Sequence, residues 1–192
     1  MKDTAVENQK PESPHRTFVR KLYDLGRALH SPNQHVLARA RRQRARWQRS
    51  LTDERFVGDV YEILLPCEVP KDHEAQCLLV AGLFALNPDN ETDQRRRWRL
   101  CAALAETGSL SAADARVRQL IGVSQTDGLE HYLRQALRLL GTAPVPRPLD
   151  YEQLLWDLIN LQSRDEIKAR TVRRRWARDF RHQVYTSQTS SE

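Results

Sequence analysis

An arginine-rich segment at residues 36–51 reads VLARARRQRARWQRSL and contains six arginines but no acidic residue. At about 100° per residue, a helix here has an apolar face that contains Val36, Ala40, Trp47 and Leu51. The opposite face carries what we call the first basic stripe, which consists of Arg39, Arg42, Arg46 and Arg49. A solvated helix normally mixes charges of both signs, because like charges repel at i,i+4 spacing. The segment therefore predicts an amphipathic helix that faces a polyanion or an acidic neighbour.

The geometry of the first basic stripe suits a nucleic-acid backbone. At about 1.5 Å rise per residue the stripe is roughly 15 Å long, which is enough to contact several phosphates. Arg41 and Arg44 lie on the other flank of the helix, next to the apolar face. We expect the stripe to bind a polyanion, and an ordinary solvated helix face is the alternative.

Composition supports the same interpretation. The chain of 192 residues has a net charge of +6, and 26 of its 31 basic residues are arginine. Arginine offers a planar set of donors that fits phosphate oxygens and can stack on bases, which lysine cannot do. A GC-rich genome also favours arginine codons, so the bias alone does not identify a ligand. A mean hydropathy of −0.69 predicts a polar globular protein.

Cysteine usage and apolar run lengths predict a cytoplasmic protein that does not bind membranes. Cys67, Cys77 and Cys101 are odd in number, lack CxxC spacing and lie among apolar residues, as buried thiols do in a reducing compartment. The longest apolar run, at 77–86, is far shorter than the about 20 residues that cross a bilayer.

The hydrophobic pattern follows the helical period, and no segment sustains an alternation of two residues. We therefore expect an all-α fold without a sheet, with about nine helices in two small bundles. The expected organisation is a disordered tail at 1–15, an N-terminal bundle at 16–92, a C-terminal bundle at 93–185 and a disordered tail at 186–192.

Three helix predictions bear on the functional surface. A nearly all-apolar helix that ends at 86 is expected to form the buried centre of the N-terminal half. A helix at 93–106 is expected to begin with the cluster RRRWR. The last helix is expected to start at a capping box of Ser163 and Glu166 and to end near Tyr185.

The last helix combines an apolar seam with a second set of arginines. The seam repeats at i+4 and contains Val172, Trp176, Phe180 and Val184. The arginines form what we call the second basic stripe, which consists of Arg170, Arg174, Arg178 and Arg181. Large aromatic side chains dominate cores, and we expect Trp47, Trp156 and Trp176 to be core anchors. Trp98 lies within RRRWR and is instead a candidate for stacking on a base.

No pattern in the sequence indicates catalysis or a bound metal. The seven glycines form no phosphate-binding loop, and the six histidines lack the spacing of metal ligands. Acidic pairs lie at expected helix starts, where the helix dipole accounts for them. We predict a protein that is not an enzyme and that has no cofactor and no metal site.

The segment at 100–140 reads LCAALAETGSLSAADARVRQLIGVSQTDGLEHYLRQALRLL. It resembles the CasB family, the small subunit of the type I-E CRISPR Cascade complex, in its small-residue turn, its arginine-bearing helix and its LRxxLxLL-type helix. Further segments resemble the family in the same order, namely RARWQRSL, AQCLLVAGLFALNPDN, LDYEQLLWDLINLQS and VRRRWARDF. The resemblance covers residues 16–185, except the variable 142–149.

The resemblance implies an all-α, non-catalytic protein that binds nucleic-acid backbone and stabilises the R-loop in antiviral defence. R-loop formation is nearly balanced in energy, so added contacts to a displaced strand can tip it. The implied partners are the guide RNA, the target and non-target DNA strands, the Cascade backbone subunits, the large subunit and a second copy of the chain.

The candidate nucleic-acid-binding residues have two origins. The resemblance assigns, by position, Arg44, Arg49, Arg116 and Arg134. Helical periodicity alone assigns Arg39, Arg42, Arg46, Arg170, Arg174 and Arg178.

Two alternative functions stay open at this point. The segment SAADARVRQLIGVSQTDGLEHYLRQ can be aligned with a helix-turn-helix, which would make the protein a regulator that binds duplex DNA. Its supposed recognition helix consists mostly of core leucines, however. The other alternative is a scaffold whose arginines pair with acidic proteins.

Overall fold

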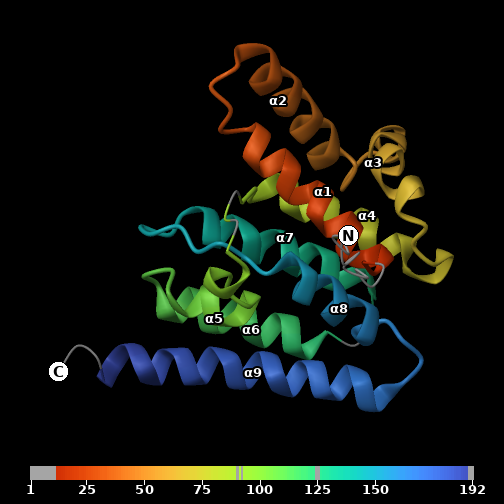
Figure 1. The fold of residues 1–192 in the computed structure, drawn as a ribbon. Coiled ribbons are helices and arrows are strands. Elements are labelled where there is room, and N and C mark those ends of the chain that lie inside the picture. Colours follow the sequence, from red (N-terminus) through yellow and green to blue (C-terminus); the bar gives the residue numbers. More distant parts are fainter. Residues whose placement is uncertain (1–11, 90, 92, 124–125, 190–192) are drawn as a thin grey trace, which may run out of the picture.

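A computed structural model describes residues 12–89, 91, 93–123 and 126–189 (Figure 1). The α-helices in these residues are α1 (Pro14–Ala28), α2 (Gln34–Arg49), α3 (Val57–Leu64), α4 (Glu74–Leu86), α5 (Leu100–Ala105), α6 (Leu110–Gly122), α7 (Thr126–Gly141), α8 (Tyr151–Leu161) and α9 (Glu166–Thr189). Short 3-10 turns join them at η1 (Glu54–Phe56), η2 (Leu65–Cys67), η3 (Lys71–His73) and η4 (Gln94–Arg96).

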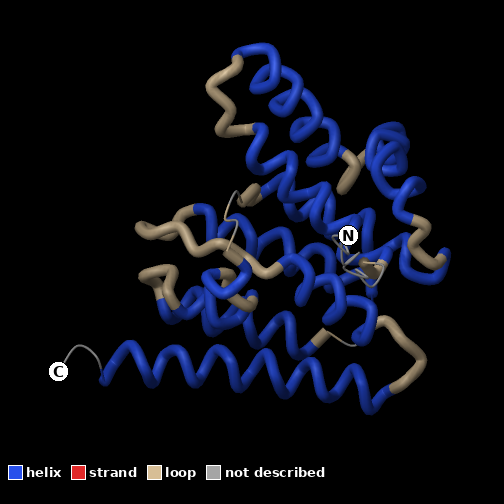
Figure 2. The backbone as a smooth tube through the Cα atoms, in the orientation of Figure 1, coloured by secondary structure: helices blue, strands red, loops and turns tan. Residues whose placement is uncertain are grey.

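The described residues consist of helices and loops and contain no strand (Figure 2). Their one isolated backbone bridge joins Trp98 to Leu149. The predicted all-α fold is therefore confirmed. None of the described helices is both long and apolar enough to cross a membrane.

Helix α4 lies at the centre of the core. Its sequence is apolar on almost every side, and Cys77, Val80, Leu83 and Phe84 have no exposed surface. It packs against α2 and α3 and also against α7 and α8. Its predicted burial is confirmed. Because α7 and α8 lie beyond residue 92, the two expected bundles share one hydrophobic core, and the boundary between them stays a prediction.

Helix α9 runs along the outside of the molecule, beside α5, α6 and α8 (Figure 1). The seam residues Val172, Trp176 and Phe180 are buried and Val184 is half-buried, as expected. Because the seam faces inward, Arg170, Arg174 and Arg178 are exposed on the opposite side of the helix.

The prediction of one helix at 93–106 is wrong. Helix α5 begins only at Leu100, and Arg97 and Arg99 have extended backbones. Trp98 takes its backbone partners from the α7–α8 connection: its N–H donates to Pro148 O at 2.7 Å, and its carbonyl accepts from Asp150 N at 2.9 Å. These bonds to a distant segment replace the helical ones.

The expected ends of the folded region also need correction. Helix α1 begins at Pro14, two residues earlier than predicted, because Ser13 caps it and proline suits a first helical position. Helix α9 continues to Thr189 instead of ending near Tyr185. Gln183 and Ser187 donate hydrogen bonds of 2.8 and 2.6 Å to Glu106, which hold its last turns. Residues 1–11 and 190–192 of the predicted tails lie outside the described residues.

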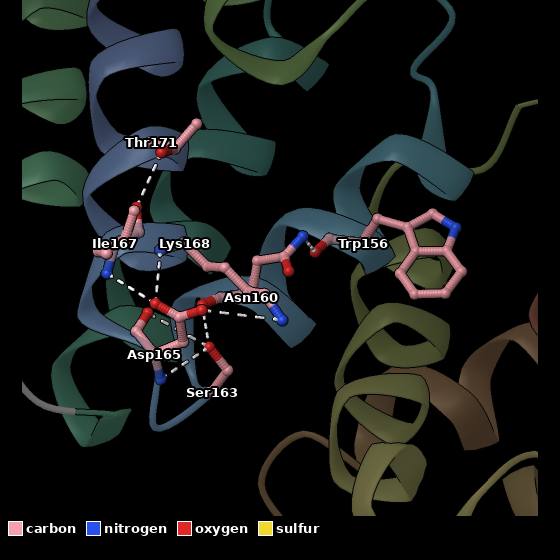
Figure 3. A network of polar contacts seen from close by, with 7 residues as sticks. All are labelled: Trp156, Asn160, Ser163, Asp165, Ile167, Lys168 and Thr171. Carbon is pink, nitrogen blue, oxygen red and sulfur yellow. Dashed lines mark hydrogen bonds and ion pairs between the residues drawn. The ribbon is translucent and has the colours of Figure 1, made fainter.

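The side chain that caps the start of α9 is that of Asp165, and not that of Ser163 as predicted (Figure 3). The Asp165 carboxylate accepts from the backbone N–H groups of Ile167 and Lys168 at 2.9 and 3.3 Å. Ser163 donates its hydroxyl hydrogen to Asn160 O at 2.9 Å and thereby ends α8. Asp165 directly precedes α9, so its carboxylate reaches the free N–H groups of the first turn.

Candidate nucleic-acid interface

Helix α2 presents the first basic stripe to solvent. Asn33 caps the helix by accepting from two N–H groups of its first turn. Ala40 and Trp47 are buried, and the Trp47 indole N–H donates to Asp59 O at 3.1 Å, which fixes the rotation of α2. Val36 was expected on the buried face but is 41% exposed, because the buried contacts of α2 begin only at Ala40. The arginines that are exposed as predicted are Arg39, Arg42, Arg46 and Arg49.

A shallow groove of about 680 Å³ lies between this stripe and α3, and we call it the α2–α3 groove. Its lining comprises Arg39, Arg42, Gln43, Ala45, Arg46, Arg49, Asp59 and Glu62. Arg46 pairs with Asp59 at 2.6 Å, and the Arg49 guanidinium lies 5.3 Å from the centre of the Phe56 ring. Among the described residues, no carboxylate lies within ion-pairing distance of Arg39 or Arg42. Acidic neighbours on α3 therefore offset only part of the charge.

Three other predicted arginines contact the protein itself. Arg44 donates through Nε to Ala85 O at 2.9 Å, at the end of α4. Arg116 donates to Gln119 at 2.7 Å on the same helix. Arg134 pairs with Glu130 at 3.6 Å. These side chains are half-buried and line neither groove. Their assignment to nucleic-acid binding stays a prediction.

The second basic stripe is exposed along α9. Arg170, Arg174 and Arg178 reach solvent, and no described carboxylate lies within ion-pairing distance of any of them. Arg181 differs, because it pairs with Asp114 of α6 at 2.6 Å. The predicted stripe therefore contains three arginines whose charge is not offset nearby.

Part of this stripe forms one wall of a second groove, of about 660 Å³, which we call the α5–α9 groove. The other wall comes from the extended segment 97–99 and the first turn of α5. The lining comprises Arg97, Trp98, Arg99, Ala102, Thr171, Arg174, Arg175, Arg178, Asp179, His182 and Gln183. The lining contains five arginines and one carboxylate, so it carries a net positive charge, although Asp157 offsets Arg175 from outside the lining.

Protein contacts fix three of the five arginines in the α5–α9 groove. Arg97 places its guanidinium 3.5 Å from the centre of the Tyr23 ring and donates to Glu91 O at 2.6 Å. Arg99 pairs with Asp179 at 3.4 Å. Arg175 pairs with Asp157, which is only 4% exposed. The fixed arginines define the walls, while Arg174 and Arg178 retain free donors for a ligand.

Sequence reasoning found Arg174 and Arg178 but missed the opposite wall. Arg97 and Arg99 join the groove because Trp98 pairs with Leu149, a contact that helical periodicity does not report. The residues that α9 contributes could have been found from their spacing. Thr171, Arg174, Arg178 and His182 stand at i, i+3, i+7 and i+11, so they lie on one face of the helix. Arg170 lies outside the groove lining.

The four tryptophans occupy different environments. Trp47 and Trp176 are buried core anchors, as predicted. Trp156 is 37% exposed, so its assignment to the core is wrong; its ring centroid lies 4.6 Å from that of the buried His15. Trp98 is half-buried and lines the α5–α9 groove.

The thiols and the supposed recognition helix face inward. Cys67, Cys77 and Cys101 are buried and unpaired, and burial raises the pKa of Cys77 to about 12. In the part of the chain that the structure describes, no three His, Cys, Asp or Glu side chains are grouped as metal ligands. Helix α7 packs against α4, α5 and α6 and buries the leucines of its central face. The supposed recognition helix is therefore part of the core, which disfavours the helix-turn-helix alternative.

Comparisons with known proteins give one consistent result. A family profile described as CRISPR-associated protein Cse2 matches residues 36–180. The crystal structure of CasB from Thermus thermophilus is 27% identical, with a TM-score of 0.60 over 89% of this chain and 99% of that chain. CasB from Thermobifida fusca is 23% identical, with a TM-score of 0.57 over 85% of this chain and 93% of that one. CasB from M. ruber is 22% identical, with a TM-score of 0.62 over 95% and 100%. No curated protein matches significantly.

The profile match begins at Val36 on α2 and ends at Phe180 on α9, so it includes both basic stripes up to Arg178. The likenesses below 25% identity support the fold alone. Together, the profile and the fold agree with the resemblance given by the sequence. The chain belongs to the CRISPR-associated Cse2 family, also called CasB, whose members are subunits of the type I-E CRISPR Cascade complex.

Proposed function

We propose that this protein is a non-catalytic small subunit of a type I-E Cascade complex in the cytoplasm, where it binds nucleic-acid backbone and stabilises the R-loop. The observation that carries this proposal is the α5–α9 groove, in which Arg174 and Arg178 retain free donors between walls that other arginines fix. The strand bound there is the displaced non-target DNA strand. The other partners are the guide RNA with its target strand, the Cascade backbone subunits, the large subunit and a second copy of this chain.

Electrostatics favours backbone binding over base reading. Guanidinium groups in an open groove donate to phosphate oxygens and release counterions, which gives affinity without sequence preference. Helix α7 packs against α4, α5 and α6 and leaves only a few exposed side chains, such as His131 and Arg138, for contact with a major groove. Binding should therefore be indifferent to sequence, with single strands bound at least as well as duplexes.

The α2–α3 groove is a second contact surface in this proposal. Arg39 and Arg42 supply its charge, while Arg46 and Arg49 already contact Asp59 and Phe56. An exposed ion pair contributes only about 0–1 kcal/mol, so a phosphate can displace Asp59 at little cost. The surface therefore suits either a strand or an acidic face of a neighbouring subunit.

A reconstituted Cascade that carries Arg174→Gln and Arg178→Gln tests the proposal. We expect the complex to assemble and to find its target, but its R-loops to collapse sooner. R-loop formation is nearly balanced in energy, and the variant lacks two contacts to the phosphates of the displaced strand. The matched control is Arg138→Gln with Arg164→Gln, which removes the same charge from exposed positions outside both grooves. Equal R-loop lifetimes in the two double variants would contradict the proposal.

A further inference from the structure

Trp98 is an aromatic side chain built into the wall of a basic groove. Its backbone N–H donates to Pro148 O at 2.7 Å and its carbonyl accepts from Asp150 N at 2.9 Å. The residue is half-buried and lines the α5–α9 groove. Part of the residue packs against the hydrophobic core, and part remains exposed.

Arg147 supports the Trp98 ring. Its guanidinium carbon lies 4.9 Å from the centre of the indole, within the range of a cation–π contact. Glu106 holds Arg147 in place through an ion pair of 2.9 Å. Glu106 also accepts hydrogen bonds from Gln183 and Ser187 of α9, so the support of the ring and the arginine-bearing wall belong to one network.

Arg147 is absent from the groove lining, whereas Trp98 belongs to it together with Arg174 and Arg178. The ring therefore contacts a fixed cation that is not part of the lining, and Trp98 itself is a half-buried lining residue that packs against the core. In proteins that bind single strands, arginines that follow the backbone are combined with aromatic rings on which bases stack. The α5–α9 groove has both parts.

We propose that Trp98 is a stacking platform for one unpaired base of the strand whose phosphates Arg174 and Arg178 contact. This inference rests on the proposed function and adds to it a contact with a base of the bound strand. In a duplex each base is already stacked on its neighbours, so only an unpaired base can stack on the indole without the cost of unstacking. Trp98 therefore makes the groove select single-stranded nucleic acid.

Binding of two oligonucleotides of equal length, one oligothymidine and one abasic, tests the proposal by fluorescence anisotropy. The two probes share a phosphate backbone, and only the first can stack. Trp98→Leu should weaken oligothymidine binding by about 5- to 100-fold and leave abasic binding unchanged. Trp98→Tyr keeps an aromatic ring and should retain most of the affinity. Trp156→Leu is the matched control, because it removes an exposed tryptophan outside the groove.

The outcomes separate this inference from the function on which it rests. If Trp98→Leu weakens the binding of both probes equally, or of neither, the stacking platform is contradicted. If Arg174→Gln with Arg178→Gln weakens the binding of both probes while Trp98→Leu has no effect, the backbone groove stands and the platform fails. If the arginine variant changes neither probe, the proposed function itself fails.

Cross-linking of the unaltered protein gives a readout that does not depend on the folding of a variant. An oligonucleotide that contains bromodeoxyuridine is irradiated in the complex, and the linked residue is identified by mass spectrometry. A stacked base should link to Trp98. Linkage confined to residues outside the α5–α9 groove would overturn the assignment.

Discussion

The indole N–H of Trp176 donates a hydrogen bond of 2.6 Å to Oδ2 of Asp157, and both side chains are buried between α8 and α9. The other carboxylate oxygen accepts from Gln153 at 2.7 Å and from the Arg175 guanidinium. Burial raises the pKa of Asp157, although these donors act in the opposite direction. One carboxylate thus joins a core anchor to an arginine in the wall of the α5–α9 groove.

The first prediction concerns the stability contributed by Trp176. Trp176→Ala should lower the free energy of unfolding by about 3–5 kcal/mol, because it leaves a large cavity under α9. Trp176→Phe keeps most of the packing and removes the N–H donor, so it should cost about 1–3 kcal/mol. Chemical denaturation of the two variants measures both values. An unchanged stability of the alanine variant combined with weaker strand binding would mean that Trp176 is a base platform instead of a core residue.

The second prediction is a pH dependence that arises from Glu106. Hydrogen bonds from Ser187 and Gln183, and then the contact with Arg147, lower the pKa of this carboxyl. A lowered pKa means that the unfolded state binds a proton first as the pH falls. The ionised Glu106 carboxyl therefore stabilises the folded state fully above about pH 4.3, the ordinary pKa of Glu. This stabilisation is lost as the pH falls through the lowered pKa of the folded state.

Comparison of the unaltered protein with Glu106→Gln measures this effect, because glutamine keeps the size but does not titrate. The difference in free energy of unfolding between the two should be constant near neutral pH and should shrink in acid. A difference that stays constant down to pH 3 would show that Glu106 does not have this role.

The sequence was sufficient for elements that depend on local periodicity. The seam of Val172, Trp176 and Phe180 and the exposed arginines of α2 follow from spacing on a single helix, and the structure has them as expected. The wall at 97–99 could not be predicted in this way. Arginine is a good helix former, so RRRWR reads as helical, but only its first two residues lie in a 3-10 turn. Its last three residues are extended, and the bridge from Trp98 to Leu149 holds them there. The segments that contain Trp98 and Leu149 follow α4 and α7 in the chain. Whether they meet depends on how the whole core positions these helices.

The hydrogen-bond and ion-pair partners of individual arginines could not be predicted from the sequence either. Arg44 and Arg46 are neighbours on one helix, yet Arg44 donates to Ala85 O while Arg46 pairs with Asp59. The difference arises because α2 packs against both α4 and α3, and each arginine reaches a different one of them. Spacing predicts which side of a helix an arginine occupies, but not what packs there.

The third prediction concerns the first basic stripe. Replacement of Arg39, Arg42, Arg46 and Arg49 by Gln should leave the fold intact, since exposed substitutions usually change stability by less than about 0.5 kcal/mol. The loss of the ion pair between Arg46 and Asp59 should lower the free energy of unfolding by about 0–1 kcal/mol more. Cascade should still assemble, and strand binding should weaken. Native mass spectrometry beside a strand-binding curve measures both. Failed assembly with unchanged strand binding would favour a scaffold that binds acidic protein partners.

The most direct test of the central claim is the salt dependence of single-strand binding by the protein that carries Arg174→Gln and Arg178→Gln. On a single strand, log affinity falls with log salt at about −0.7 per neutralised phosphate, so the loss of two contacts should make the slope shallower by about 1.4. The control Arg138→Gln with Arg164→Gln has the same net charge and should keep the slope of the unaltered protein. If both double variants give the same slope, the α5–α9 groove does not bind the strand.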